Sequence, residues 1–343
     1  MGRLFRMGTR EVECIVVGGG PAGSTAAWEL TRQGRDVLVL DAMEFPRQKL
    51  CAGWLTPKVL EDLELTGGSV PSLEFIPTFK IHWKHRHPNI EVPAGQYSVQ
   101  RHLFDAFLLE RSNAPVAVHR VHSIQRTDDG FVVDGKFACR YLIGAGGTHC
   151  PVKRQIFPNL HSGDSVALAR ELEFKPYGPI RRESRLLWRM PYDPGFAWFV
   201  PKPDAVNIGF GYFKHSRALT KDPWVYFVDH LKALGLLSPE DNPKAKGWGY
   251  YLLRDPRITV KDRGAYLIGD AAGLATEDLG EGIGPAVESG LLSAREILGS
   301  GDYGLENVTR YSVYGGRYLG RLLSPLYDNS GGAILRGLGI GKA

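Results

Sequence analysis

A short apolar run near the N-terminus is followed at once by a glycine-rich turn. Residues 12–17 read Val-Glu-Cys-Ile-Val-Val, which is typical of a strand buried on both faces of a parallel sheet. Helical spacing then covers about residues 21–33, and Gly34 favours the left-handed conformation that ends a helix. A second apolar run, residues 36–40, ends at Asp41. The pattern predicts a strand, a turn, a helix and a second strand that ends at an acid.

Further along, alternating and helical patterns follow one another. Alternation of apolar and polar residues predicts strands, and apolar residues spaced three or four apart predict helices. The segment 183–213 is rich in β-formers and aromatic residues, so several strands are expected there. The other expected strands cover residues 79–84, 131–134, 141–143 and 264–268, and the expected helices cover 103–109, 223–237 and 285–294. This mixture indicates an α/β protein.

The turn at residues 18–23 has the glycine spacing of a dinucleotide-binding motif. Gly18 permits a tight turn, Gly20 lets the backbone approach a pyrophosphate, and Gly23 lets the helix pack close to the strands. Asp41 follows 18 residues after Gly23, close to the spacing of about 20 expected for a carboxylate that binds ribose hydroxyls. The motif therefore predicts dinucleotide binding, and a glycine-rich turn in another kind of α/β protein is the alternative.

The composition, with 43% apolar and 23% charged residues, is that of an ordinary globular protein. A length of 343 residues suits two lobes better than one core. No apolar run approaches the ~20 residues that cross a bilayer, and the N-terminal residues contain no apolar signal segment. We therefore expect a cytoplasmic protein.

Charge, cysteine and histidine positions all argue against nucleic-acid or metal binding. The net charge is +5, and no long run of Lys and Arg is present. The four cysteines lie far apart without a Cys-x-x-Cys pair, which favours reduced thiols over a zinc site. His82, His85 and His87 alternate with Lys and Arg, whose charges would repel a cation. We expect no metal and no nucleic-acid partner.

The C-terminal residues 306–343 predict a basic helical tail. Apolar and aromatic residues recur at i, i+3, i+7 and i+11 from Tyr311, and arginines flank this stripe. A basic amphipathic helix can lie on an anionic membrane, so peripheral membrane contact is one interpretation. The alternative is a helix packed on the nucleotide lobe, since Gly315 and Gly316 weaken a free-standing helix by about 1 kcal/mol each.

Several further motifs follow the glycine turn in order. They are Phe-Pro-Arg-Gln-Lys-Leu-Cys-Ala-Gly at 45–53, Arg101 with Phe104-Asp105, Gly-Phe-Ala-Trp-Phe-Val-Pro-Lys at 195–202, and the glycine-rich segments 269–273 and 280–283. Together they resemble FAD enzymes with the p-hydroxybenzoate hydroxylase fold. The chain is most similar to the geranylgeranyl reductase family, because of Pro-Arg-x-Lys-x-Cys-x-Gly and of the aromatic motif that resembles Gly-Tyr-x-Trp-x-Phe-Pro. The likeness covers residues 12 to about 295.

The resemblance implies a set of FAD-binding residues. Those implied for the ADP half are Gly18, Gly20, Pro21, Ala22, Gly23 and Asp41. Arg47 and Arg101 would lie along the pyrophosphate and ribityl region, and Asp270 would bind the ribityl or pyrophosphate part; a simple cap is the alternative for Asp270. Backbone N–H groups at Gly280, Gly282 and Ile283 would lie by the flavin pyrimidine edge, where a helix N-terminus stabilises the negative charge of reduced flavin.

Cys51 and Trp198 are the candidates for chemistry. The resemblance implies that Cys51 lies near the isoalloxazine ring and shapes the flavin or substrate site, although a free Cys is most often a small buried hydrophobe. Trp198 belongs to an aromatic cluster with Phe196 and Phe199, which either packs the core or forms a substrate wall.

The chain departs from the superfamily pattern at three places. An Asp linked to FAD and pyridine-nucleotide handling is replaced by Gly146, and the Ser that follows is replaced by Cys150. An Asn-Pro pair is replaced by residues 276–277, and the motif Tyr is Phe196. The electron donor therefore stays open between NAD(P)H and another reductant, including a redox partner protein.

Three functions are compatible with these residues. The favoured one is a reductase that transfers hydride from reduced FAD to carbon–carbon double bonds of an isoprenoid or lipid substrate. The second is an FAD-dependent monooxygenase that hydroxylates an aromatic substrate, and the third is a flavin-binding electron-transfer or scaffold protein.

The expected fold is α/β with an α+β second lobe. A Rossmann-like FAD-binding domain is expected at residues 1–71, 99–175 and 256–305. A β-sheet substrate domain, residues 72–98 and 176–255, is expected to be inserted into it, as in p-hydroxybenzoate hydroxylase.

Overall fold

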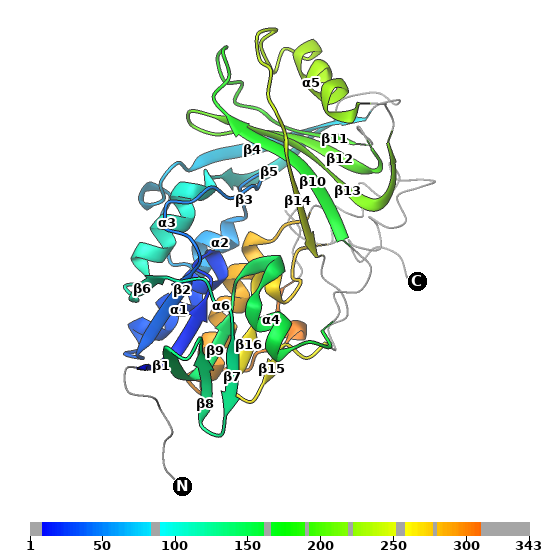
Figure 1. The fold of residues 1–343 in the computed structure, drawn as a ribbon. Helices are drawn as coiled ribbons and strands as arrows, with labels where there is room; N and C mark the ends of the chain where they lie inside the picture. The colour runs from blue at the N-terminus through cyan, green and yellow to red at the C-terminus, as the bar shows by residue number, and fades with distance from the viewer. Residues whose placement is uncertain are drawn as a thin grey trace, which may run out of the picture.

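Two β-sheets, one above the other in Figure 1, organise the chain. The computed structural model describes residues 9–83, 90–160, 166–188, 192–218, 222–251, 258–276 and 280–309. Across the first sheet the strands are β15 (Lys261–Asp262), β16 (Ala265–Leu267), β9 (Phe137–Gly144), β1 (Arg10–Val17), β2 (Val37–Asp41) and β6 (Val116–Val118). The hairpin of β7 (Ile124–Thr127) and β8 (Gly130–Val133) joins this sheet at β9.

The second sheet combines strands from distant parts of the chain. Its order is β14 (Lys246–Tyr251), β10 (Val166–Phe174), β13 (Val206–Ala218), β12 (Tyr192–Pro201), β11 (Ser184–Trp188), β4 (Glu74–Trp83), β5 (Ile90–Ser98) and β3 (Trp54–Leu55). Two of these strands, β3 and β10, come from ranges expected in the FAD-binding domain. The chain therefore passes between the two sheets several times.

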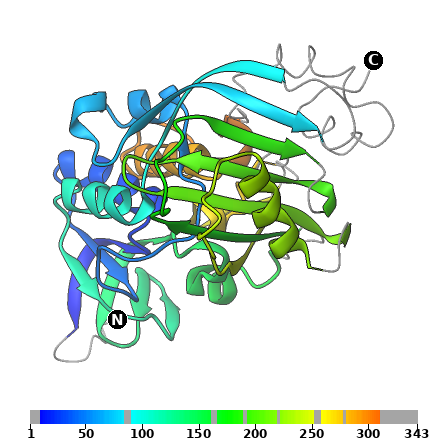
Figure 2. The ribbon, with the colours of Figure 1, turned by 90° about the horizontal axis from the view of Figure 1, so that it is seen from above.

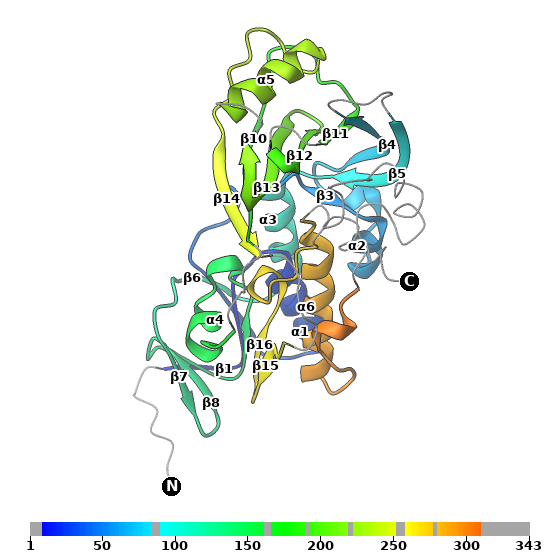
Figure 3. The same cartoon turned by 90° about the vertical axis from the view of Figure 1, so that its right-hand side faces the viewer.

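Helices cover both sheets. They are α1 (Pro21–Arg32), α2 (Pro57–Asp62), α3 (Arg101–Arg111), α4 (Pro151–Ile156), α5 (Pro223–Ala233) and α6 (Ile283–Ile297), with 3-10 turns η1 (Gly67–Ser69), η2 (Gly147–His149), η3 (Gly269–Ala271) and η4 (Leu305–Asn307). Figure 3 shows α1 and α6 on one side of the first sheet and α4 on the other. None of the helices in the described ranges combines the length and the apolar character needed to cross a bilayer.

The first sheet confirms the pattern read at the N-terminus. Strand β1 pairs in parallel with β2 and β9, and its residues from Cys14 to Val17 are buried. Helix α1 starts at Pro21, and Gly34, with φ of +77°, follows its end. Because β1 has neighbours on both edges and helices on both faces, an almost continuous apolar run suits it.

The second sheet separates its side chains onto two different faces. In β13, Val206, Ile208 and Phe210 pack with Phe227 and Leu231 of α5 in an apolar core. Figure 2 shows α5 lying across the strands. The alternate residues of β13 therefore face the first sheet, because successive side chains of a strand point to opposite faces.

One expected helix is shorter in the structure, and some of the expected features lie outside the described ranges. The helix expected at 223–237 ends at Ala233, because Gly235 adopts φ of +66° and its N–H bonds back to the Lys232 carbonyl. Of the expected tail, residues 310–343 lie outside the described part of the chain, as do His85 and His87.

Candidate functional site

A cavity of about 840 Å³ lies between the first sheet and the second. Its volume falls within the ~300–1,000 Å³ that ligand and cofactor sites occupy. All of the expected site residues except Gly23 line it: Gly18, Gly20, Pro21, Ala22, Asp41, Arg47, Cys51, Arg101, Trp198, Asp270, Gly280, Gly282 and Ile283. Residues from distant parts of the chain thus meet at one place.

The glycine turn forms one wall of this cavity. Gly18 has φ of +111°, and a Cβ atom there would lie 2.4 Å from the Ala145 carbonyl oxygen. A Cβ atom at Gly23 would lie 1.9 Å from the Gly18 carbonyl oxygen, so Gly23 serves helix packing and not the cavity surface. At Gly20 the nearest such atom is Arg47 Nη2, at 3.4 Å. The backbone at Gly20 is therefore open to a ligand.

Asp41 is buried at the end of β2. Its Oδ2 accepts a hydrogen bond from the Gly19 N–H at 2.8 Å, and its Oδ1 accepts one from the Met43 N–H at 2.9 Å. These bonds fix the carboxylate beside the glycine turn. Each carboxylate oxygen can accept more than one hydrogen bond, so Asp41 can also bind hydroxyl groups.

Two arginines reach the cavity and share one acid. Arg101 donates to both oxygens of Asp105, at 2.7 and 2.9 Å, one turn further along α3. Arg47 Nη1 lies 3.8 Å from the same carboxylate, which is completely buried. Asp105 therefore orients both cations, and two cations against one acid leave net positive charge for an anion.

Two helix N-termini also face the cavity. Gly20 precedes α1 and Gly282 precedes α6, and neither helix has a side chain that caps its first N–H groups. Such termini attract negative charge. Asp270 lies beside the second one, since a Cβ atom at Gly282 would be 3.1 Å from its Oδ1. Together with the arginines and the open backbone at Gly20, these termini fit a dinucleotide that carries a pyrophosphate.

The second sheet forms the opposite wall. Trp198 lines the cavity, and its Nε1 donates to Asn207 Oδ1 at 2.7 Å. The Asn207 amide in turn donates to the Cys51 carbonyl oxygen at 3.1 Å. Phe199 instead packs in the core under α5. The predicted aromatic cluster is therefore divided between the cavity, where Phe196 and Trp198 lie, and the core.

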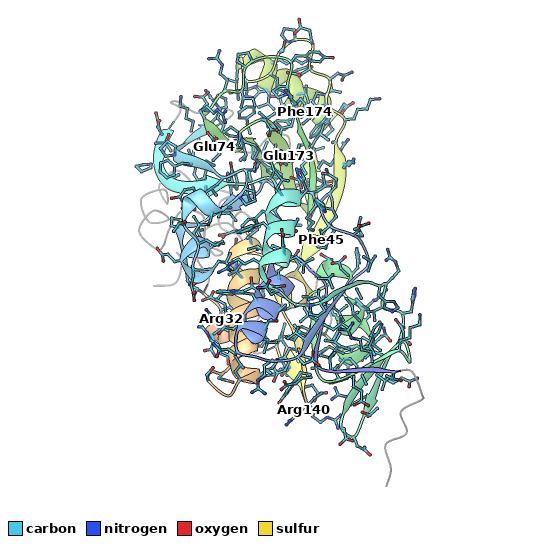
Figure 4. The ribbon with its side chains drawn as sticks, turned by 90° about the vertical axis from the view of Figure 1, so that its left-hand side faces the viewer. Arg32, Phe45, Glu74, Arg140, Glu173 and Phe174 are labelled. Atoms are coloured by element: carbon cyan, nitrogen blue, oxygen red, sulfur yellow. The ribbon has the colours of Figure 1, made fainter. Side chains whose placement is uncertain are left out.

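Four charged residues at this wall were not found from the sequence as site residues. Lys49, Glu171 and Glu173 line the cavity, and Lys202 is completely buried next to it. Figure 4 shows Phe174 on the side of the second sheet toward α5 and Glu173 toward the first lobe. The sequence signal for Glu171 and Glu173 was a pair of carboxylates at alternate positions of a largely apolar strand, since alternate residues share one face.

Burial lowers the pKa of both lysines at the cavity. It lowers the pKa of Lys49 to about 8, partly offset by the negative charge of Asp270. It also lowers the pKa of Lys202 to about 8, partly offset by Glu173. The Lys202 ammonium donates to the carbonyl oxygens of Ala52 and, at 2.8 Å, Val99. These two bonds therefore satisfy the buried Lys202 side chain.

Comparison with known proteins gives one domain match and several relatives. The NAD(P)-binding Rossmann-like domain matches residues 16–46. The chain is 30% identical over 324 residues to a menaquinone reductase of Mycobacterium tuberculosis, covering 84% of this chain and 77% of that protein. It is 26% identical over 345 residues to digeranylgeranylglycerophospholipid reductase 2 of Methanosphaera stadtmanae, covering 91% and 84%.

A solved structure is also similar. It is a geranylgeranyl bacteriochlorophyll reductase-like protein from Thermoplasma acidophilum, with a TM-score of 0.74 and 17% identity over 96% of this chain and 87% of that one. This similarity confirms the expected architecture, a Rossmann-like domain with an added β-sheet lobe.

Proposed function

Because this chain belongs to the geranylgeranyl reductase family of FAD-dependent oxidoreductases, we propose that it reduces carbon–carbon double bonds of an isoprenoid or lipid substrate. When bound, FAD that has been reduced by NAD(P)H or another reductant supplies the hydride. The observation that supports this proposal most is that one cavity joins a dinucleotide cradle to a wall with aromatic side chains.

In this proposal the glycine turn and β2 hold the ADP half of FAD. The open backbone at Gly20, with Pro21, Ala22 and the turn made by Gly18 and Gly23, faces the pyrophosphate. Asp41 binds the ribose hydroxyls, for which its fixed carboxylate is suited.

Positive charge then follows the cofactor toward the second lobe. Arg47 and Arg101 lie along the pyrophosphate and ribityl region, and Asp270 binds the ribityl or pyrophosphate part. The start of α6, with Gly280, Gly282 and Ile283, faces the flavin pyrimidine edge and stabilises negative charge there.

Cys51 and Trp198 define the substrate end of the cavity. The Asn207 amide connects them, because it accepts from Trp198 and donates to the Cys51 carbonyl. An indole face suits the apolar chain of an isoprenoid, and the fixed Cys51 backbone keeps the flavin wall rigid.

We also propose the division into an FAD-binding domain at 1–71, 99–175 and 256–305 and a substrate domain at 72–98 and 176–255. The two separate sheets support it, with β3 and β10 as strands of the second sheet that come from the first set of ranges. A cytoplasmic enzyme that contacts a membrane peripherally through residues 306–343 would meet a lipid substrate there.

The test is an anaerobic turnover. The purified protein, with its FAD chemically reduced, is mixed with a detergent-solubilised lipid that carries geranylgeranyl chains, and the lipid is analysed by mass spectrometry. We expect a gain of two hydrogens for each double bond reduced, and reoxidation of the flavin, without oxygen.

The same mixture distinguishes a hydroxylase. Such an enzyme would be silent until oxygen is admitted and would then incorporate an atom from labelled dioxygen into its product. That outcome would refute the reductase function, as would a purified protein with no affinity for FAD.

A further inference from the structure

Glu171 lines the cavity from the second sheet, on strand β10. On β10 it pairs with Gly209 of β13, and Gly209 pairs in turn with Trp198 of β12. Directly paired residues of neighbouring strands share one face of the sheet, so the three form a row. The middle position has no side chain: a Cβ atom at Gly209 would lie 2.5 Å from Trp198 Cζ2 and 2.6 Å from Glu171 Cβ. The Trp198 ring therefore extends over Gly209 toward Glu171.

The carboxyl group of Glu171 is buried, and one of its two oxygens has no hydrogen-bond partner in the described structure. The side chain of Glu171 is 2% exposed and lines the cavity, and this oxygen is Oε2. A buried polar atom without a partner is costly, which indicates a role for it with a bound ligand.

The surroundings of Glu171 favour its protonated form. Burial raises the pKa of Glu171 to about 7, although a hydrogen bond from Asn207 and the positive charges of Lys49, Lys202 and Arg101 oppose that rise. Lys246, the exposed residue paired with Glu171 on β14, also lines the cavity. At neutral pH a proton can therefore be both held and released at this group.

We propose that Glu171 is the acid that delivers the proton to the substrate double bond during reduction. This proposal rests on the proposed function and adds the second reactant that double-bond reduction requires. Glu171 would be a catalytic residue in direct contact with the substrate.

The reaction balances with this group in place. One alkene carbon accepts a hydride from the reduced flavin, and the other forms a C–H bond with the proton that breaks from the Glu171 carboxyl. The alkene gains two electrons and the flavin loses two. Glu171 is left as a carboxylate and regains a proton from water, and NAD(P)H or another reductant reduces the flavin again. Positive charge that develops on the alkene during protonation lies near the Trp198 ring, whose face attracts cations.

Glu173 and Cys51, which also line the cavity, are less suited to donate the proton. Glu173 is half-buried, and Gln100 Nε2 lies 3.5 Å from its Oε1. The Cys51 thiol accepts from the Gly53 N–H at 3.3 Å, within its own turn. Glu173 therefore offers a matched control, a carboxylate on the same strand and face two residues away.

The experiment compares Glu171→Gln with Glu173→Gln. Both variants are loaded with FAD, reduced without oxygen, and mixed with the geranylgeranyl lipid while flavin reoxidation is followed. We expect Glu171→Gln to lower the single-turnover rate ~10²-fold or more, with its FAD dissociation constant within about two-fold of the wild type. Glu173→Gln, which also removes a carboxylate from the cavity lining, should lower this rate much less, by about three-fold at most. The wild-type rate should fall as the pH rises through about 7.

A second measurement needs no turnover. Infrared spectra of the protein without substrate should contain a protonated-carboxyl C=O band that disappears with a midpoint near pH 7 and is absent from Glu171→Gln. A variant Glu171→Gln that reacts as fast as the wild type, or a Glu171 that is already ionised at pH 5, would overturn this inference alone. A wild-type enzyme that reduces no lipid while binding FAD would overturn the proposed function and this inference together.

Discussion

Gly20 and Gly23 stand in one turn but perform different physical tasks. Gly23 is enclosed, because a Cβ atom there would meet the Gly18 carbonyl oxygen at 1.9 Å. Gly20 has an ordinary extended backbone, with φ of −74°, and only the flexible end of Arg47 lies near its missing Cβ. Gly23 therefore serves the packing of the fold, and Gly20 serves the binding of the ligand.

Substitutions at these two glycines should therefore have different effects. Gly20→Val should abolish FAD retention, because the side chain fills the pyrophosphate position, and should cost the apoprotein no more than about 1 kcal/mol. Gly23→Ala should destabilise the apoprotein by about 3 kcal/mol or more through the backbone clash. Flavin fluorescence titration and chemical unfolding measure the two effects. Wild-type FAD affinity in Gly20→Val would contradict the assignment of the cradle.

Strand β13 supports a core on one face and a cavity on the other. One set of alternate residues is apolar and packs under α5, and the other set, Asn207, Gly209 and Gly211, is small or polar. The small residues leave room for the indole of Trp198, which crosses from β12 over Gly209.

The two glycines of β13 form a matched pair for mutation. A Cβ atom at Gly209 would overlap Trp198, so Gly209→Ala should cost about 1–3 kcal/mol in the free energy of unfolding and displace the ring. A Cβ atom at Gly211 would lie 3.6 Å from Trp198, an ordinary contact, so Gly211→Ala should be neutral or stabilise by about 0.4–1 kcal/mol. Urea unfolding and tryptophan fluorescence test this. Equal destabilisation by both would show that Trp198 does not depend on Gly209.

Elements with local signals were predictable from the sequence, and their partners were not. Helix α1 is marked by Pro21 at its start and Gly34 after its end. The parallel pairing of β1 with β9, by contrast, joins residues more than a hundred positions apart, and no nearby residue specifies it. Glu171 was missed for a related reason, since its role depends on a row of three strands that only the folded sheet assembles.

Lys202 forms hydrogen bonds to the chain segments that connect the two sheets. It lies between β12 and β13 and donates to backbone carbonyls of Ala52 and Val99, at points where the chain crosses between the sheets. Gly53, with φ of +72°, makes room for it, because a Cβ atom there would lie 2.6 Å from the Lys202 ammonium.

Lys202→Met should destabilise the protein by about 1–3 kcal/mol for each carbonyl left without its donor. The effect should depend on pH. Lys202 has a pKa of about 8 in the folded protein, against an ordinary value of about 10.4 in the unfolded chain, so folding releases a proton between these values. The stability that Lys202 contributes therefore rises with pH between about 8 and about 10.4, and it stays at its lowest value below pH 8. Unfolding free energies are measured at about pH 7.5, below this window, and at about pH 9.5, within it. The difference between wild type and variant should be larger at the higher pH. A difference that shrinks at the higher pH would contradict the lowered pKa of Lys202 in the folded protein.

Because the order of strands is interleaved, both sheets stay incomplete until late in the synthesis of the chain. The first sheet lacks β16 and the second lacks β14 until the ribosome has passed residues 246–267, because these strands pair with β9 and β10 made much earlier. A nascent chain therefore carries exposed strand edges of both sheets for most of its synthesis. Neither lobe can be completed and released as a unit before the other. Truncation before residue 246 leaves two unfinished sheets, and chaperones that shield strand edges are expected to be important for the yield of this protein.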